Sequence, residues 1–292
     1  MPSADIELGG ITFSVVSERE ISWGTQDSSY LPFLVISSQE GALSFPVRLD
    51  FSAMPDTSGF PTVFDVGDMW SLFTDGNAFV IVQTAAESGP PSWAIQFSRK
   101  ASDITVFSAR PDWEVLESNP FSYPVDQLLL IFLMAWHKGA LIHSAGGVLG
   151  GLGYLFAGVS GAGKSTLSRC LIERGYEMLS DDRMIVRKMD GEFRAFGTPW
   201  AGEADIAGRG NLPLGGIFFL CQSRENKVRD LNPSRAAERL MPVTSIPFFD
   251  RETTNDILSF CEDLVTHIPA YELCFRPGAE IVDLLEEFLT KR

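Results

Sequence analysis

Short apolar runs alternate with turn-forming residues over roughly the first hundred positions, and each run has the length of one β-strand. Asp75-Gly76-Asn77 lies between two such runs and predicts a tight hairpin, while Gly89-Pro90-Pro91 interrupts the next pair. We therefore predict a mostly antiparallel β domain over residues 1–124, with a structural or partner-docking role. The clearest strand predictions, rich in β-branched and aromatic residues, are 33–36, 78–82 and 104–107.

The pattern becomes helical near residue 125. A helix is predicted from Val125 to His137, because Pro124 fits its first turn and Lys138-Gly139 ends it. Apolar side chains lie almost all round this helix, which is typical of a buried helix. We place the start of a second domain, residues 125–292, at this helix.

The second domain alternates strands with helices. The order strand, glycine-rich loop, helix, strand is that of an α/β unit. Gly175 fits the left-handed position that follows a helix, and the spacing of Ile281, Leu284, Leu285 and Phe288 predicts a C-terminal packing helix. The predicted strands are 140–143, 154–157, 177–180 and 216–221, and the predicted helices are 164–174 and 281–289.

Composition and charge narrow the functional classes. The chain has 38 acidic and 23 basic residues and a formal net charge of -15, so neither nucleic acid nor a membrane is expected as a partner. The first residues lack the basic start and the following apolar stretch of a signal peptide, so we do not expect one. The longest apolar run, residues 128–136, is far shorter than the roughly 20 residues that cross a bilayer. We expect a cytoplasmic protein.

Cysteine and histidine usage argues against a zinc site. The four cysteines lie in apolar segments without C-x-x-C spacing, and we expect them to be buried, reduced thiols. The chain has only three histidines. The cysteines are Cys170, Cys221, Cys261 and Cys274.

Residues 158–165, G-V-S-G-A-G-K-S, match the phosphate-binding P-loop pattern in full, after a predicted strand and at the start of a predicted helix. Glycines let successive N–H groups point at one phosphate, and the helix dipole adds its positive end. Lys164 supplies a full charge for the outer phosphates, and the Ser165 hydroxyl is a typical magnesium ligand. ATP or a related nucleotide is therefore expected, with Mg²⁺, on Gly158, Ser160, Gly161, Ala162, Gly163, Lys164, Ser165 and Thr166.

A similar loop is common in transporter ATPases, but the rest of the sequence does not fit that class. Those enzymes carry a second glycine-serine signature and then an apolar strand that ends in Asp-Glu. Here the late apolar strand, residues 216–220, ends in Cys221-Gln222, without a carboxylate. Paired carboxylates instead follow the loop helix directly, as Ser180-Asp181-Asp182.

Residues 140–187 carry, in order, His143, the loop with Lys164, Arg174-Gly175 and Asp181-Asp182. This run resembles the catalytic domain of HPr kinase/phosphorylase, a bifunctional serine kinase family related to phosphoenolpyruvate carboxykinase. The resemblance implies an α/β P-loop kinase domain, preceded here by the β domain. It fades by residue 225, and neither the family's later Glu-Ile-Arg-Gly-Leu-Gly signature nor its N-terminal half is present. We therefore expect a relative with a different substrate.

The resemblance also implies catalytic roles. Asp182 would accept the proton of an attacking hydroxyl, and His143 would hydrogen-bond that carboxylate. Lys164 and the loop amides would neutralise the charge on the moving phosphate. An arginine for the same charge is left unassigned. Three arginines are open to that role: Arg224, Arg235 and Arg251.

Magnesium ligands are expected beside the loop. Ser165 and one aspartate, Asp181, would hold the ion directly or through water, and Glu203 is a further candidate. Adjacent aspartates after a strand are more often a turn or a helix cap in an arbitrary sequence. Their spacing from a full P-loop pattern favours the functional interpretation here.

Three functions remain open at this point. The first is ATP- and Mg-dependent phosphoryl transfer to a serine or threonine of a protein or peptide, for which the resemblance also implies a reverse reaction and a homo-oligomer. The second is a small-molecule or carboxykinase-like enzyme with the same phosphate site. The third is a catalytically silent nucleotide-binding regulatory module. An enclosed acceptor cavity beside Asp182 would favour the second.

Overall fold

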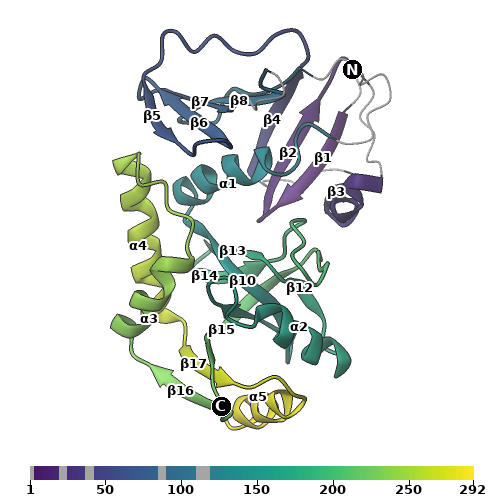
Figure 1. Cartoon of the computed structure of the whole chain (residues 1–292), viewed down its shortest axis with the longest axis vertical. Coiled ribbons are helices and arrows are strands. Elements are labelled where there is room, and N and C mark those ends of the chain that lie inside the picture. The colour runs from purple at the N-terminus through teal and green to yellow at the C-terminus, as the bar shows by residue number, and fades with distance from the viewer. Residues whose placement is uncertain (1–2, 20–24, 37–42, 85–89, 110–118) are drawn as a thin grey trace. The chain divides into compact units, whose positions relative to one another are not determined.

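The chain divides into two compact units, Met1–Leu129 and Leu130–Arg292. The division falls inside helix α1 (Val125–Trp136), and Figure 1 labels the elements of both units. The structure, a computed structural model, describes residues 3–19, 25–36, 43–84, 90–109 and 119–292.

The N-terminal unit is built on a nine-stranded sheet in the order β3-β1-β2-β4-β9-β8-β7-β6-β5. Strand β4 pairs in parallel with β2 and with β9, and the other neighbours are antiparallel. The prediction of a mostly antiparallel β fold is confirmed for this unit. Its strands are β1 (Ser3–Leu8), β2 (Ile11–Val16), β3 (Leu34–Val35), β4 (Leu43–Asp50), β5 (Thr62–Asp65), β6 (Trp70–Thr74), β7 (Ala78–Gln83), β8 (Trp93–Ser98) and β9 (Ile104–Ser108).

The turn chemistry of this sheet was predictable in part. Asp75 Oδ1 accepts the N–H groups of Asn77 and Ala78 at 2.8 and 2.9 Å, which closes the predicted β6–β7 hairpin. The strand predicted at 33–36 is confirmed only at Leu34 and Val35, because Phe33 belongs to a 3-10 helix (Thr25–Phe33) and the strand has only two residues. Pro32 has no N–H to give to a ladder, which delays the start of that strand. Of the predicted break before β8, Gly89 lies outside the described residues.

The C-terminal unit is a mixed α/β fold. Its eight-stranded sheet runs β11-β10-β13-β14-β15-β17-β16, with β12 paired to β10. A further pairing of β11 with β15 closes a ring through β10, β13 and β14. Its strands are β10 (Gly139–Leu149), β11 (Leu152–Ala157), β12 (Met178–Ser180), β13 (Arg183–Met189), β14 (Glu192–Phe196), β15 (Asn211–Gln222), β16 (Lys227–Leu231) and β17 (Ala270–Phe275).

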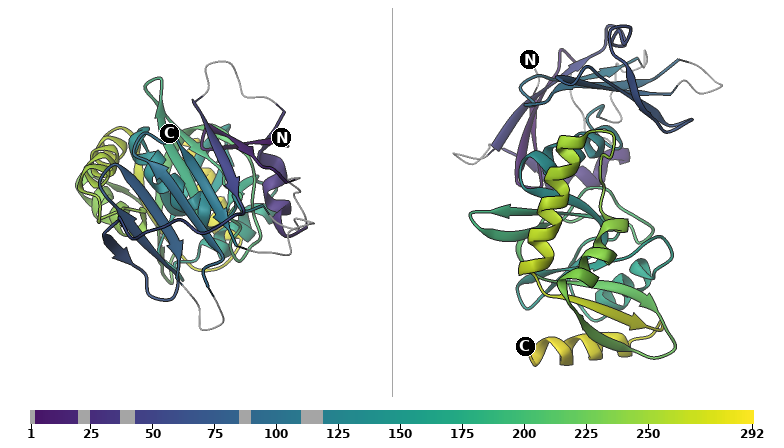
Figure 2. Two further views of the ribbon diagram at one scale, coloured as in Figure 1. Left: turned by 90° about the horizontal axis from the view of Figure 1, so that it is seen from above. Right: turned by 90° about the vertical axis from the view of Figure 1, so that its left-hand side faces the viewer.

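Helices cover both faces of this sheet. Helices α2 (Lys164–Glu173) and α5 (Glu280–Thr290) contribute to one apolar cluster with Phe156 and Phe218. Helices α3 (Pro233–Leu240) and α4 (Arg251–His267) contribute to the other cluster, with Phe219. In the right-hand view of Figure 2 the yellow-green helix α4 lies in front of the strands. Neighbouring residues of β15 thus face opposite clusters, as strand alternation requires.

Strands β11, β15 and β17 are parallel neighbours, so their carboxyl ends meet at one edge. Strands β11 and β12 are both antiparallel to β10, which lies between them, and therefore run in the same direction. Helix α2 connects them and completes the predicted α/β unit. Ligands of α/β sheets commonly bind at the carboxyl ends of parallel strands.

Several element boundaries agree with the sequence. Helix α1 ends at Trp136, followed by Lys138 with φ 55°, and α5 spans the predicted C-terminal helix. Gly175 has φ 90° and donates to the Ile172 carbonyl at 2.9 Å, so the predicted helix end is confirmed.

Strand β10 is longer than predicted because Gly146 stays within it. A Cβ there would lie 2.3 Å from Met184 Sδ, so glycine makes room for packing instead of ending the strand. Among the described helices, none is long and apolar enough to cross a membrane.

Candidate functional site

Residues 158–165, here called the glycine loop, connect β11 to α2 at the carboxyl end of β11. Gly161 and Gly163 have φ of 79° and 104°, a region that side-chain-bearing residues rarely adopt. A Cβ on Gly163 would also lie 2.9 Å from the Phe275 ring. Gly163 precedes α2 and offers its first N–H groups no side-chain acceptor. An anion can therefore accept them, and the helix dipole favours it.

Strand β10 brings His143 to this loop. His143 is paired with Arg183 of β13, and the next residue, Ser144, is paired with Ala157 at the end of β11. The His143 carbonyl accepts the N–H of Gly158 at 3.4 Å. His143 thus contacts the start of the glycine loop through its carbonyl and is paired with β13, the strand that begins directly after Asp182.

Asp182 lies in the short connection between β12 and β13. Its Oδ1 accepts a hydrogen bond from His143 Nε2 at 3.2 Å, and its Oδ2 lies 3.5 Å from Arg183 Nε. The Ser180 hydroxyl accepts the N–H groups of Asp182 and Arg183 at 3.3 and 3.2 Å, which fixes the turn. The His143 hydrogen bond is the main reason that the pKa of Asp182 lies below its ordinary value; burial opposes it, and the Arg183 and Lys164 charges assist. Asp182 is therefore ionised at neutral pH.

Asp181 has a different environment, since it is only 2% exposed. Its Oδ1 accepts the N–H groups of Gly202 and Ile206 at 2.7 and 3.3 Å, and its Oδ2 accepts that of Ala204 at 2.6 Å. Three of the roughly four lone-pair positions of this carboxylate are therefore used by one backbone segment. Asp181 anchors the segment that carries Glu203, and it retains little capacity for a metal ion.

Lys164 is buried, with 7% of its surface exposed. Its ammonium group donates to the carbonyl oxygens of Gly158 and Val159 at 3.0 and 3.4 Å. Burial is the main cause of a lowered pKa for Lys164, and the nearby Asp182 charge opposes that shift. Both carbonyl acceptors are neutral, so they do not compensate the positive charge of the buried ammonium group. A bound phosphate would compensate it. The residues present therefore fit a bound phosphate.

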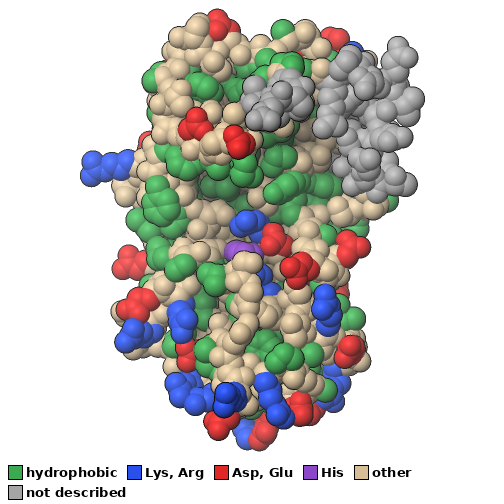
Figure 3. Space-filling view, in the orientation of Figure 1, with side chains coloured by type: hydrophobic (Ala, Val, Ile, Leu, Met, Phe, Trp, Pro, Cys, Tyr) green, Lys and Arg blue, Asp and Glu red, His purple; other side chains and the backbone are tan. Residues whose placement is uncertain are grey.

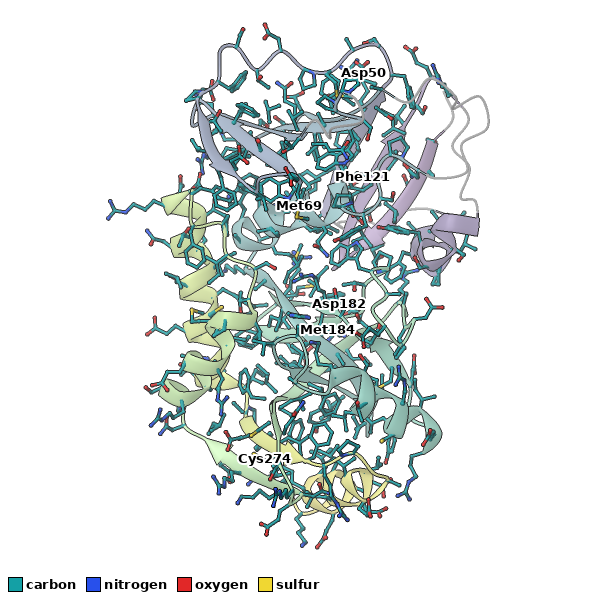
Figure 4. All side chains as sticks on the ribbon, viewed as in Figure 1. Asp50, Met69, Phe121, Asp182, Met184 and Cys274 are labelled. Atoms are coloured by element: carbon teal, nitrogen blue, oxygen red, sulfur yellow. The ribbon has the colours of Figure 1, made fainter. Side chains whose placement is uncertain are left out.

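A cavity of about 260 Å³ joins these groups. In Figure 4 Asp182 is labelled among the side chains at this part of the C-terminal unit, and Figure 3 shows a histidine with basic and acidic side chains close to it. Predicted site residues supply most of its lining. The lining residues are His143, Ser160, Gly161, Gly163, Lys164, Ser165, Thr166, Asp181, Asp182, Gly202, Glu203 and Gln222.

Two predicted loop residues, Gly158 and Ala162, pack within the loop and against the core. A Cβ on Gly158 would lie 2.6 Å from that of Ala162, and Ala162 packs against the apolar cluster beneath α2. These residues shape the loop, and neither lines the cavity. The three arginines considered from the sequence, Arg224, Arg235 and Arg251, are also absent from the lining.

Four residues at the site were missed from the sequence, and one of them, Gly202, lines the cavity and donates its N–H to Asp181. Ser180 and Arg183 flank the aspartate pair, so their adjacency could have indicated them. Gln222 carried no signal, because only the parallel register of β15 and β11 brings it to the loop. Its Nε2 donates to the Gly161 carbonyl at 2.6 Å. This hydrogen bond holds the glycine loop against the end of β15.

Sequence comparison finds relatives for part of this chain. HPr kinase/phosphorylase 1 of Oceanobacillus iheyensis is 26% identical over 142 residues, which are 47% of this chain and 42% of the relative. HPr kinase/phosphorylase of Clostridium novyi is 27% identical over 138 residues, again 47% and 42% of the two chains. The chain therefore spans less than half the length of the curated relatives it matches. No protein-family model matches the chain.

Comparison with solved structures finds the HPr(Ser) kinase/phosphatase from Coxiella burnetii. The match covers 52% of this chain and 88% of that one, with 14% sequence identity and a TM-score of 0.32. The sequence similarity to HPr kinase/phosphorylases is the finding that bears on function.

Proposed function

We propose that this protein transfers the terminal phosphate of ATP or a related nucleotide, with Mg²⁺, to a serine or threonine hydroxyl of a protein or peptide. The observation that carries the proposal is the shared cavity of Lys164, Ser165 and the ionised Asp182. A phosphate donor site and a proton acceptor thereby face the same space. Partial sequence similarity to HPr kinase/phosphorylases supports this reading.

The phosphate end of the reaction rests on the glycine loop. Its amides and the first turn of α2 would hold the phosphate tail, and Lys164 would neutralise charge on the outer phosphates. When bound, Mg²⁺ would supply further neutralisation of the transferring group. The Ser165 hydroxyl is our candidate for a direct ligand, and Asp181 or Glu203 would act through water.

Asp182 would orient the acceptor hydroxyl and receive its proton. The lowered pKa makes the Asp182 carboxylate a weak base. A weak base would be a poor catalyst if the acceptor hydroxyl had to lose its proton before the transition state. Phosphoryl transfer passes through a loose transition state in most analyses, so the nucleophile loses its proton late and positioning matters more. His143 and Arg183 each contact one oxygen of the carboxylate and would hold it in place.

The size of the cavity favours an acceptor that approaches from outside. About 260 Å³ is below the roughly 300–1,000 Å³ of sites that enclose a drug-sized ligand. It suits a phosphate tail and a metal ion better than a nucleotide together with an enclosed small acceptor. This supports a protein or peptide acceptor over a small-molecule kinase, and the intact Lys164, Ser165 and Asp182 set argues against a silent module.

The test is phosphorylation with labelled ATP and Mg²⁺ of candidate proteins encoded beside this gene, followed by phosphoserine and phosphothreonine mapping. Asp182→Asn should abolish transfer and leave nucleotide affinity within a few fold, because the side chain touches the acceptor and not the loop amides. Lys188→Ala, which removes a lysine paired with Asp263 away from the cavity, is the control and should retain transfer. A normal transfer rate in the asparagine variant would exclude the role given to Asp182.

A further inference from the structure

A second group of potential metal ligands lies in the C-terminal unit, apart from the cavity. The ligand atoms of Cys221, Glu272 and Cys274 all lie within 4.8 Å of one another. Figure 4 labels Cys274 well separated from Asp182. None of the three residues lines the cavity described above.

The register of two strands creates this group. Cys221 of β15 is the direct partner of Cys274 of β17 in a parallel pairing. Glu272 precedes Cys274 by two residues, so strand alternation directs both side chains to the same face. The sequence argued against a zinc site because it has only three histidines and lacks C-x-x-C spacing. That argument could not include cysteines brought together from separate strands.

The carboxylate of Glu272 is already oriented. Arg239 of α3 donates to its Oε1 at 2.5 Å, and Arg229 of β16 lies 3.7 Å from its Oε2. Each carboxylate oxygen keeps a further lone pair. Hydrogen-bonded carboxylates of this kind are usual around metal ions, because an outer partner fixes the ligand. Cys274 is buried while Cys221 is partly exposed, so the group is closed on one side and accessible on the other.

The same register disfavours a disulfide. Adjacent strands lie about 4.7–4.9 Å apart, and directly opposed parallel residues keep their Cβ atoms at a similar separation. A disulfide needs a Cβ–Cβ distance of about 3.5–4.5 Å, so closing one would require the backbone to move. A metal ion bridges two sulfur atoms without a bond between them and fits the wider spacing.

We propose that Cys221, Glu272 and Cys274 bind a soft divalent cation, and that zinc is the ion this ligand set selects. Two thiolates and a carboxylate are ligands that Zn²⁺ accepts, and a water would complete the four ligands that it prefers. Hard cations such as Mg²⁺ prefer oxygen ligands, so the group discriminates against the ion expected at the cavity.

This site is coupled to the glycine loop through the residues that follow its two cysteines. Gln222, next to Cys221, donates to the Gly161 carbonyl at 2.6 Å. Phe275, next to Cys274, packs against Gly163. An ion that ties β15 to β17 at their carboxyl ends therefore restrains both supports of the loop.

The test is a titration of the reduced full-length protein with Co²⁺, a spectroscopic substitute for Zn²⁺. We expect a thiolate-to-cobalt absorption band that saturates at about one ion per chain and is displaced by Zn²⁺. Cys221→Ser and Cys274→Ser should each remove most of the band. Cys170→Ser, which alters a partly exposed cysteine of α2 outside the group, should keep it.

Thermal unfolding gives a second readout that needs no nucleotide. Saturating Zn²⁺ should raise the midpoint of the parent protein by a few degrees and leave that of Cys221→Ser unchanged, since a ligand stabilises only the form it binds. Cys221 is the less buried thiol, so this variant keeps the test valid if Cys274→Ser fails to fold. Absence of the cobalt band, its survival in Cys221→Ser, or its loss in Cys170→Ser would overturn the proposal.

Discussion

At the scale of single residues, two neighbouring aspartates have unlike surroundings. Asp181 is enclosed by backbone N–H groups, whereas Asp182 faces the cavity between His143 and Arg183. The sequence assigned proton acceptance to Asp182 and a metal ion to Asp181, but it could not show that a distant segment donates three N–H groups to Asp181. The structure thus separates a carboxylate that anchors a backbone segment from one that faces the cavity.

Lys164→Ala should weaken both nucleotide binding and transfer. The buried ammonium group is a charged donor, and losing such an interaction costs about 1.5–3 kcal/mol, or roughly 10- to 100-fold in the dissociation constant. Calorimetric titration with ATP and Mg²⁺ measures this change. Lys188→Ala serves as the control, and an unchanged affinity in Lys164→Ala would show that the loop does not bind the phosphate tail.

The contribution of Asp182 to folding stability should decrease at low pH. Because its folded pKa is lowered, its ionised form stabilises the fold above the unfolded pKa of about 3.9, and that contribution is lost as pH falls through the folded value. The difference in unfolding free energy between the parent and Asp182→Asn should therefore be present at about pH 5 and shrink as the pH falls from about 4 to 3. Denaturant unfolding across this range is the measurement. A difference that does not shrink between about pH 5 and 3 would contradict the assigned ionisation.

At the scale of elements, strand register assembles the site. Strand β10 pairs with β11, which precedes the glycine loop, and with β13, which follows Asp182. Strands β15 and β17 end beside the loop. Gln222 and Phe275 support it from those two strands. The shape of the loop is therefore a property of the sheet as well as of its glycines.

Gly163→Ala tests that dependence. The substitution combines a backbone φ of 104° with a contact of 2.9 Å to the Phe275 ring, and we expect a loss of about 1–3 kcal/mol in stability together with impaired nucleotide binding. Gly191→Ala is the matched control, since its φ is 85° but a Cβ there meets nothing within 4 Å. It should lose only about 1 kcal/mol and bind normally. Equal effects of the two substitutions on binding would show that the packing against Phe275 has no role.

At the scale of the whole molecule, local patterns identified most elements and missed what depends on long-range pairing. Helix α1, helix α5, the β6–β7 hairpin and the Gly175 helix end were predictable because caps, turns and periodicity are local. The full length of strand β10 and the 3-10 helix before β3 were not predictable, because packing around Gly146 and the position of Pro32 decided them. For the site, the sequence indicated the glycine loop, His143 and the aspartates, but Gln222 and the cysteine pair emerge only from register.

A crystal structure with Mg²⁺ and a non-hydrolysable ATP analogue tests phosphoryl transfer at the Asp182 cavity most directly. We expect the β-phosphate on the amides of the glycine loop, the metal ion on Ser165, and the terminal phosphate in the cavity facing the Asp182 carboxylate. A nucleotide bound elsewhere, or a terminal phosphate directed away from Asp182 with no space between them for a hydroxyl, would contradict phosphoryl transfer at this site.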